Sequence, residues 1–158
     1  MITAKYESRI KPEGEYECII TKAHIDVTKS GKEYISIPMT IREDIEQPYK
    51  KGKIFYALWK RREPSALDME VERYSFDQLM QVCEACGIPA GTNFESLEDI
   101  LDKISWKPVL CRLKHDEYNG KQQEKVHYLK KTGHPVNVQA PVYAAPEPAE
   151  EDDGDLPF

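Results

Sequence analysis

Aromatic and cationic residues lie close together in stretches of the chain where strands are predicted. Tyr34 and Arg42 share one parity of the stretch 34–42, and Trp59 is followed directly by three cations. Flat rings can stack on bases while cations neutralise phosphates, so the combination is typical of surfaces that hold single-stranded nucleic acid. Solvated cations and core packing of Phe55 and Trp59 are the simpler explanation of the same residues. The candidate contacts are Tyr34, Arg42, Phe55, Trp59, Lys60, Arg61, Lys114, Tyr118 and Lys121.

Four residues have the spacing of zinc ligands. Cys83 and Cys86 form a C-x-x-C pair, and His115 follows Cys111 by four positions. The pair falls inside a predicted amphipathic helix, and Cys111 lies on a parity that we expect to face the core. Buried thiols are therefore the simpler interpretation, and we expect no metal.

Two acidic pairs could hold Mg²⁺ in a nuclease, Glu43 with Asp44 and Asp68 with Glu70. Charged loop residues explain them equally well. The chain contains no glycine-rich phosphate loop, no G-x-S-x-G and no H-E-x-x-H motif. We therefore expect neither enzymatic activity nor a cofactor, and a metal-dependent nuclease remains a minor alternative.

The last seven residues form an acidic run that ends in Leu-Pro-Phe. A carboxylate on an aromatic residue after proline can dock in an apolar pocket with a basic rim, while the acids steer the approach. Two uses stay open, binding of partners in trans and competition with nucleic acid for the basic surface. The residues predicted to bind partners are Asp152, Asp153, Asp155, Leu156, Pro157 and Phe158.

Three strands are predicted in the first part of the chain. The stretch 15–28 is rich in β-branched and aromatic residues, and its apolar parity changes near Lys22, which predicts a bulge. A turn at 29–32 leads to the stretch 34–42, whose odd positions from 35 to 41 are apolar. Pro38 lacks an amide donor, which favours an edge position or a bulge. Residues 53–60 form a third strand with two apolar faces, so parity does not tell which face is buried.

Helices and a second hairpin follow. The S-x-x-Q sequence from Ser75 to Gln78 predicts a helix of about three turns that ends near Gly87, and a shorter one runs from Ser96 to Ile104. Residues 108–114 and 124–131 are alternating strands, and Asn119-Gly120 between them is a hairpin signal. Residues 132–158 have too little apolar content to fold, so we expect a disordered acidic tail.

The predicted order is β-β-β-α-α-β-β, a mainly β chain with α+β elements. It matches a five-stranded OB-fold-like barrel with a helical insertion between strands 3 and 4. An antiparallel α+β sandwich with the same order stays open. The barrel would occupy residues 1–131, followed by the tail at 132–158.

Composition narrows the class of protein. The longest apolar run, 54–59, has six residues, against about 18 for a membrane helix. The four cysteines are irregularly spaced, and the N-terminus has no apolar segment typical of a secretory signal. Both observations predict a protein with free thiols in the reducing cytoplasm. The net charge is −6, yet residues 63–102 carry −9 while the rest of 1–131 carries +9. Such asymmetry favours an interaction function.

The last seven residues, 152–158, form a tip that resembles the C-terminal peptide of bacterial single-stranded DNA-binding proteins, in which aspartates precede an aliphatic residue, Pro and Phe. Gly154 interrupts the acids here. Residues 8–130 resemble a bacteriophage family of single-stranded DNA-binding proteins known as a domain of unknown function. The matching stretches are 12–16, 28–32 and 52–55.

The resemblance implies a protein that coats single-stranded DNA in the host cell. Its tail would recruit replication, recombination or repair proteins. The rival prediction is an interaction adaptor that docks such proteins without touching DNA. Self-association, site size and the choice between DNA and RNA stay open.

Overall fold

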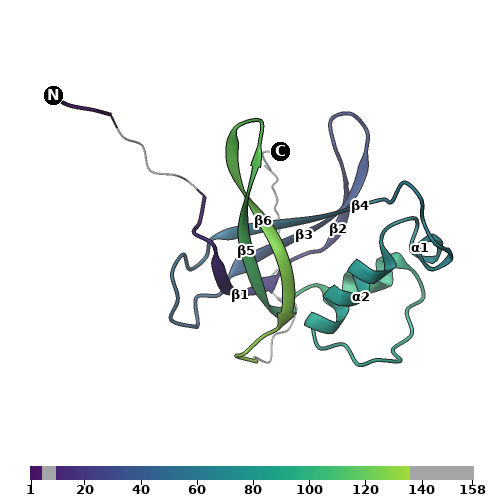
Figure 1. The fold of residues 1–158 in the computed structure, drawn as a ribbon. Helices are drawn as coiled ribbons and strands as arrows, with labels where there is room; N and C mark the ends of the chain where they lie inside the picture. Colours follow the sequence, from purple (N-terminus) through teal and green to yellow (C-terminus); the bar gives the residue numbers. More distant parts are fainter. Residues whose placement is uncertain (5–9, 136–158) are drawn as a thin grey trace.

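The computed structural model of the chain describes residues 1–4 and 10–135, and within them a mainly β protein with one open antiparallel sheet (Figure 1). The six strands follow the order β2-β3-β1-β5-β6, with β4 paired to β3. The strands are β1 (Gly14–Ile20), β2 (His24–Val27), β3 (Glu33–Ile41), β4 (Lys53–Trp59), β5 (Pro108–Tyr118) and β6 (Lys121–Lys131). The helices are α1 (Ala66–Glu70), α2 (Phe76–Ala85) and α3 (Leu97–Ile104).

The predicted first strand is interrupted near Lys22, which is why the sheet has six strands and not five. The backbone N–H of Ala23 leaves the sheet ladder and donates to Ser105 Oγ at 3.0 Å. Pro38 lies opposite this interruption, and its carbonyl accepts from the N–H of Thr21 at 2.9 Å. β3 therefore tolerates a residue without an amide donor here, as the sequence predicts.

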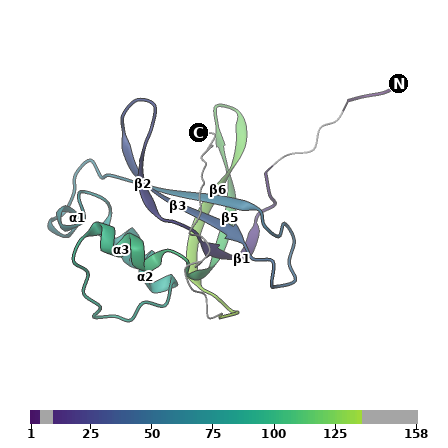
Figure 2. The same ribbon diagram turned by 180° about the vertical axis from the view of Figure 1, so that it is seen from behind.

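β3 supplies the centre of the hydrophobic core. Its four alternating apolar residues, Ile35, Ile37, Met39 and Ile41, are each 0% exposed. The predicted core face is therefore confirmed. The helices gather on one side of the sheet (Figures 1 and 2) and contribute buried residues from α2 and α3. Because this covering lies on the core side, the opposite face of β2, β3 and β4 is left for other contacts.

The helical insertion lies between β4 and β5, as predicted. Ser75 Oγ accepts from the N–H of Gln78 at 3.1 Å and so caps α2, which ends before Gly87 at φ +81°. The short α1 is not predicted, although Ser65 and Asp68 form a capping box there. Among the described residues, no helix combines the length and apolarity needed to span a membrane.

The last two strands form a long hairpin. Asn119 and Gly120 have φ of 54° and 77°, which suits the two-residue turn that the sequence predicts. The strands continue up to this turn and are longer than predicted, since β5 reaches Tyr118 and β6 begins at Lys121. Both loops, this one and the β2–β3 loop at 28–32, project from the same end of the molecule (Figures 1 and 2).

Candidate nucleic-acid interface

β4 buries one apolar face and exposes the other. Ile54 and Leu58 are each 1% exposed, whereas Phe55 and Trp59 are 53% and 40% exposed. Successive side chains of a strand point to opposite faces, so Phe55, Ala57 and Trp59 share the solvent side. The face of β4 that carries Ile54 and Leu58 is therefore the buried one. Phe55 and Trp59 lie on the other face, so the presence of these two aromatic residues is not explained by packing in the core.

Side chains of β2, β3 and β4 form rows across this solvent face. Directly paired residues of an antiparallel sheet project from the same face, so the register defines each row. The rows are Asp26, Tyr34 and Trp59; His24, Ser36 and Ala57; Pro38 and Phe55; and Thr40 and Lys53. The small Ser36 and Ala57 therefore lie between two rows that carry large rings.

A groove of about 490 Å³ follows these rows. Ser36 and Ala57 form its floor because their short side chains leave space between Phe55 and Trp59. The two rings belong to residues four positions apart, a separation of about 13 Å along a strand, so a planar base can enter between them. The lining residues are Asp26, Val27, Thr28, Lys29, Tyr34, Ser36, Phe55, Tyr56, Ala57 and Trp59.

Tyr34 and Trp59 form one aromatic platform. Their ring centroids lie 4.7 Å apart with 32° between the ring planes. Lys32 Nζ lies 5.0 Å from the centre of the Trp59 ring, a cation–π distance. Burial, followed by the nearby Asp26 carboxylate, raises the pKa of Tyr34. The phenol therefore stays neutral at physiological pH and can donate a hydrogen bond.

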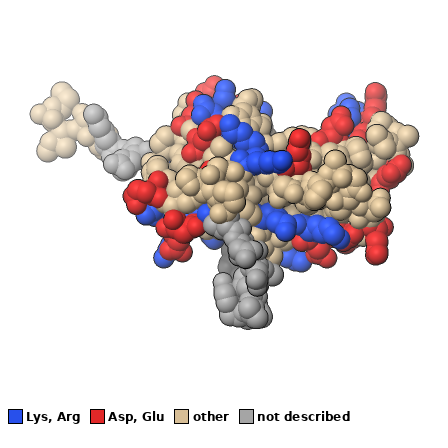
Figure 3. All heavy atoms as spheres, turned by 90° about the horizontal axis from the view of Figure 1, so that it is seen from below, with Lys and Arg blue, Asp and Glu red and all other residues tan. Residues whose placement is uncertain are grey.

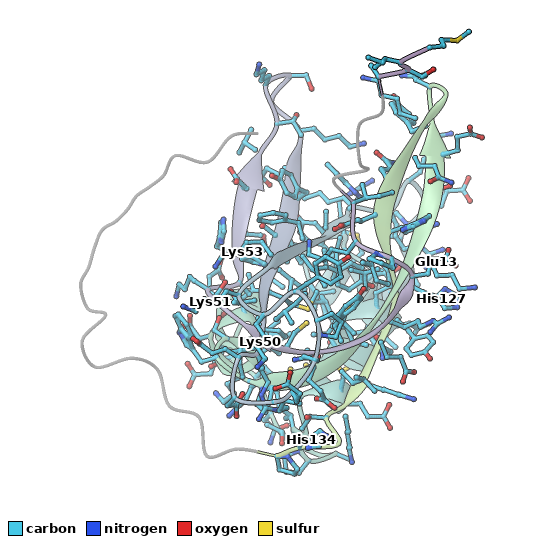
Figure 4. The ribbon with its side chains drawn as sticks, turned by 90° about the vertical axis from the view of Figure 1, so that its left-hand side faces the viewer. Glu13, Lys50, Lys51, Lys53, His127 and His134 are labelled. Carbon is cyan, nitrogen blue, oxygen red and sulfur yellow. The ribbon has the colours of Figure 1, made fainter. Side chains whose placement is uncertain are left out.

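Exposed cations lie at both ends of the groove. Lys29 and Lys32 belong to the β2–β3 loop at one end. Lys53 lies at the other end, two residues from Phe55 on the same face of β4, and its Nζ donates to Thr40 Oγ1 at 2.9 Å. Figure 4 shows it on the side of the molecule that also carries Lys50 and Lys51. Sequence reasoning missed Lys53.

The β5–β6 hairpin carries three of the predicted contacts. Tyr118 is 65% exposed, and Lys121 follows it across the turn. Lys114 is exposed further along β5. These three residues lie on one hairpin, and none of them lines the groove. The loop of this hairpin and the β2–β3 loop extend in the same direction (Figures 1, 2 and 4).

Two predicted phosphate contacts are engaged within the protein. Lys60 Nζ lies 2.9 Å from Glu33 Oε1 and 5.6 Å from the centre of the Tyr74 ring. Arg61 Nη1 lies 3.2 Å from the buried Asp68 Oδ2. The structure places neither side chain among the groove lining. Their part as phosphate contacts stays a prediction.

The prediction of an outward-facing Arg42 is wrong. Its side chain is 2% exposed, and it donates to both carboxylate oxygens of Asp44, at 3.0 and 2.8 Å. A further bond of 2.6 Å reaches the carbonyl of His134. Hydrogen bonding to Arg42 lowers the pKa of Asp44. The parity of β3 ends at Ile41, so Arg42 packs against the residues that follow β6.

Asp26 and Ala57 are groove residues that sequence reasoning missed. Neither residue belongs to a sequence motif. Each lies in the groove because strand pairing places it beside a groove residue of the neighbouring strand. Tyr34 pairs with Asp26, and Ser36 pairs with Ala57. The length of the loop at 28–32 fixes the first pairing, so that loop was the signal that could have revealed Asp26.

The zinc-like spacing does not form a site. Cys83 and Cys86 belong to or adjoin α2, and burial raises their pKa to about 11 and about 12. Cys111 is buried in β5, and His115 Nε2 lies 2.6 Å from the carbonyl oxygen of Lys11. Within residues 1–4 and 10–135, no three His, Cys, Asp or Glu side chains gather as metal ligands.

Two of the four carboxylates considered for a nuclease, Asp44 and Asp68, are bound by groups of the protein itself. Asp68 is 2% exposed and accepts from the N–H groups of Phe76, at 2.8 Å, and Ser65, at 2.9 Å. These backbone hydrogen bonds lower the pKa of Asp68. Asp44 is bound by Arg42. One member of each predicted pair, Asp44 and Asp68, is thus engaged by hydrogen bonds within the protein.

Charges of both signs lie on the face opposite the hairpin loops. Figure 3 shows Lys and Arg interspersed with Asp and Glu there. The imbalance between sequence segments thus does not divide this face into a basic and an acidic half. The predicted partner-binding tip, 152–158, lies outside the described residues.

Together these features define a mainly β protein with an exposed aromatic groove bordered by lysines. The chain belongs to the family described as "Protein of unknown function (DUF669)", whose family model matches residues 4–141. None of the curated proteins matches the chain.

Proposed function

We propose that this protein binds single-stranded DNA without enzymatic activity and coats unpaired strands during replication, recombination or repair. The observation that carries the proposal is the groove between Phe55 and the paired Tyr34 and Trp59 rings. Each base stacked on such a ring contributes about 1–3 kcal/mol to the binding free energy, whichever of the four bases it is. The partner-recruiting part predicted for the tail stays a prediction.

The strand order supports an OB-like barrel as the architecture behind this surface. β1 pairs with both β3 and β5, and residues of β4 lie close to β6. Closure between β4 and β6 would complete the barrel. OB-folds bind through strands 2 and 3 and through the loops after strands 1 and 4. In this chain those parts are β3, β4 and the two projecting loops.

The lysines support a path for the phosphates. Lys32 lies beside Trp59 at one end of the groove, and Lys53 lies beyond Phe55 at the other. A strand whose bases stack on the rings would bring phosphates to both ends. Each neutralised phosphate releases counterion from the strand, so affinity should fall with salt.

The test is binding of a labelled, unstructured, mixed-sequence 20-mer, followed by fluorescence anisotropy. Trp59→Ala should weaken binding about tenfold or more, because one stacking platform is lost. Leu67→Ala is the matched control, since Leu67 is 49% exposed on α1 and is not among the residues that line the groove. It should leave affinity within twofold.

A second readout uses intrinsic fluorescence. The chain has two tryptophans, Trp59 and Trp106. In the Trp106→Phe variant the emission of Trp59 alone should be quenched on adding the oligonucleotide. If the wild-type protein forms no complex with the 20-mer in dilute buffer, the proposal is wrong.

A further inference from the structure

Asp26 is the one acid among the described residues that line the groove. It lies in the same row as the aromatic platform, paired with Tyr34, which in turn pairs with Trp59. Its side chain is 35% exposed, so the carboxylate is accessible from the groove. A carboxylate beside a stacking platform needs an explanation in a surface that would hold a polyanion.

Neighbouring groups hold this carboxylate in place. Asp26 Oδ1 accepts from the N–H of Val27 at 2.8 Å. The hydroxyl of Tyr34 donates to Oδ2 at 3.5 Å, and His24 Nε2 lies 3.7 Å from the same oxygen. These contacts leave acceptor capacity on both oxygens, since each carboxylate oxygen has two lone pairs.

Charge decides what can lie against Asp26. A phosphate there would be repelled, and the repulsion is stronger at a protein surface than in water. A base edge with a hydrogen-bond donor would instead be attracted, because an ionised carboxylate only accepts. Phosphates therefore meet the lysines at the groove ends, and a base edge meets Asp26.

We infer that the groove selects bases that carry an exocyclic amino group, cytosine above thymine. This inference rests on the proposed function. Cytosine offers its N4 amino group as a donor, and pairing of Asp with this group is an established mode of base recognition. Thymine has a carbonyl oxygen at the same position, which the carboxylate repels. Its N3–H lies between two carbonyl oxygens, so approach to it is also unfavourable.

The experiment compares labelled oligo-dC and oligo-dT of equal length by anisotropy, at about pH 8 so that cytosine, whose own pKa is far lower, stays neutral. The wild-type protein should bind oligo-dC about tenfold more tightly than oligo-dT. Asp26→Asn keeps an acceptor for Val27 and removes the charge. In this variant oligo-dT should bind more tightly, and the two affinities should lie within twofold.

Two further variants separate base recognition from general charge effects. Glu33→Gln removes the same charge from the neighbouring end of β3, at a residue outside the groove lining. It should raise both affinities together and leave their ratio unchanged. Tyr34→Phe keeps the ring, removes the hydroxyl that orients Asp26, and should lower the ratio without weakening oligo-dT. It also serves as the test variant should Asp26→Asn not fold.

The outcomes distinguish this inference from the proposed function. Tight binding of oligo-dC and oligo-dT with equal affinity would overturn the selectivity and leave DNA binding in place. A ratio unaffected by both Asp26→Asn and Tyr34→Phe would also overturn it. Failure to bind any of the three oligonucleotides, the mixed-sequence 20-mer, oligo-dC and oligo-dT, would overturn both.

Discussion

Replacing Arg42 by methionine removes a guanidinium that joins the end of β3 to residues after β6. Methionine keeps the apolar length of the arginine side chain. It cannot form the hydrogen bonds that the guanidinium donates to Asp44 and to the His134 carbonyl. The guanidinium also lies 4.0 Å from Glu17 Oε1, and Glu17 accepts from the Thr132 hydroxyl. We call these residues, Glu17, Arg42, Asp44, Thr132 and His134, the Arg42 cluster.

The expected loss of stability follows from the burial of each partner. Breaking a buried ion pair by removing one member costs about 3–5 kcal/mol. Here Asp44 is 55% exposed and can return to water, and Glu17 keeps the donors of Thr132 and Gly133. We therefore expect about 2–3 kcal/mol, at the low end of that range or below it. For a domain of this size the loss corresponds to a Tm decrease of roughly 6–10 °C.

The loss should depend on pH in a defined direction. The guanidinium beside Asp44 holds the pKa of that carboxyl below its usual value. A carboxyl with a depressed folded-state pKa contributes stability above its unfolded pKa, about 3.9, and loses it as pH falls through the folded value. The difference between wild type and Arg42→Met should thus be full near neutral pH and shrink below about pH 4.

Urea unfolding of both proteins across this pH range is the assay. Lys22→Met is the control, because it removes a cation from a pair whose side chains are 65% and 67% exposed and should cost less than about 0.5 kcal/mol. DNA affinity of Arg42→Met should stay within twofold of wild type. A cost for Arg42→Met as small as that of the control, or a large loss of DNA binding, would refute the reasoning.

Two further predictions concern the lysines and the long hairpin. With about four phosphate contacts, the logarithm of the binding constant should fall with the logarithm of salt concentration at a slope of about 3. Lys53→Ala should reduce that slope by about 0.7, because one phosphate contact is lost. Lys22→Ala is the control and should leave the slope unchanged. A flat salt dependence in anisotropy titrations would contradict this. Gly120→Val places a β-branched residue at φ +77° and should destabilise the protein by about 1–2 kcal/mol in urea, unlike Gly14→Ala, whose added Cβ meets nothing within 4 Å. Equal stability of the two glycine variants would contradict the expected strain.

Much of the fold follows from local patterns. The alternation from Ile35 to Ile41 predicts the buried face of β3 because only one of its faces packs on the core. Asn119-Gly120 predicts the hairpin turn because both residues tolerate positive φ. Ser75 and Ser96 predict the starts of α2 and α3 because their hydroxyls accept from backbone N–H groups of the first turn.

The site is less predictable because it depends on contacts between segments. β4 is apolar on both faces, so only its pairing with β3 shows that Phe55 and Trp59 are exposed. Parity predicts an outward Arg42, but partners distant in sequence bury it. The positions of Asp26 and Lys53 in the surface come from cross-strand register, which no single stretch of sequence contains.

The Arg42 cluster also determines where the chain leaves the sheet. Glu17 on β1 accepts from the Thr132 hydroxyl and from the N–H of Gly133, so these residues are tied to the end of the sheet opposite the projecting loops (Figure 1). A fluorescent reporter or an immobilisation anchor joined directly after Pro135 would therefore be attached far from those loops. The same attachment at Asn119 would place the added bulk beside Tyr118 and Lys121.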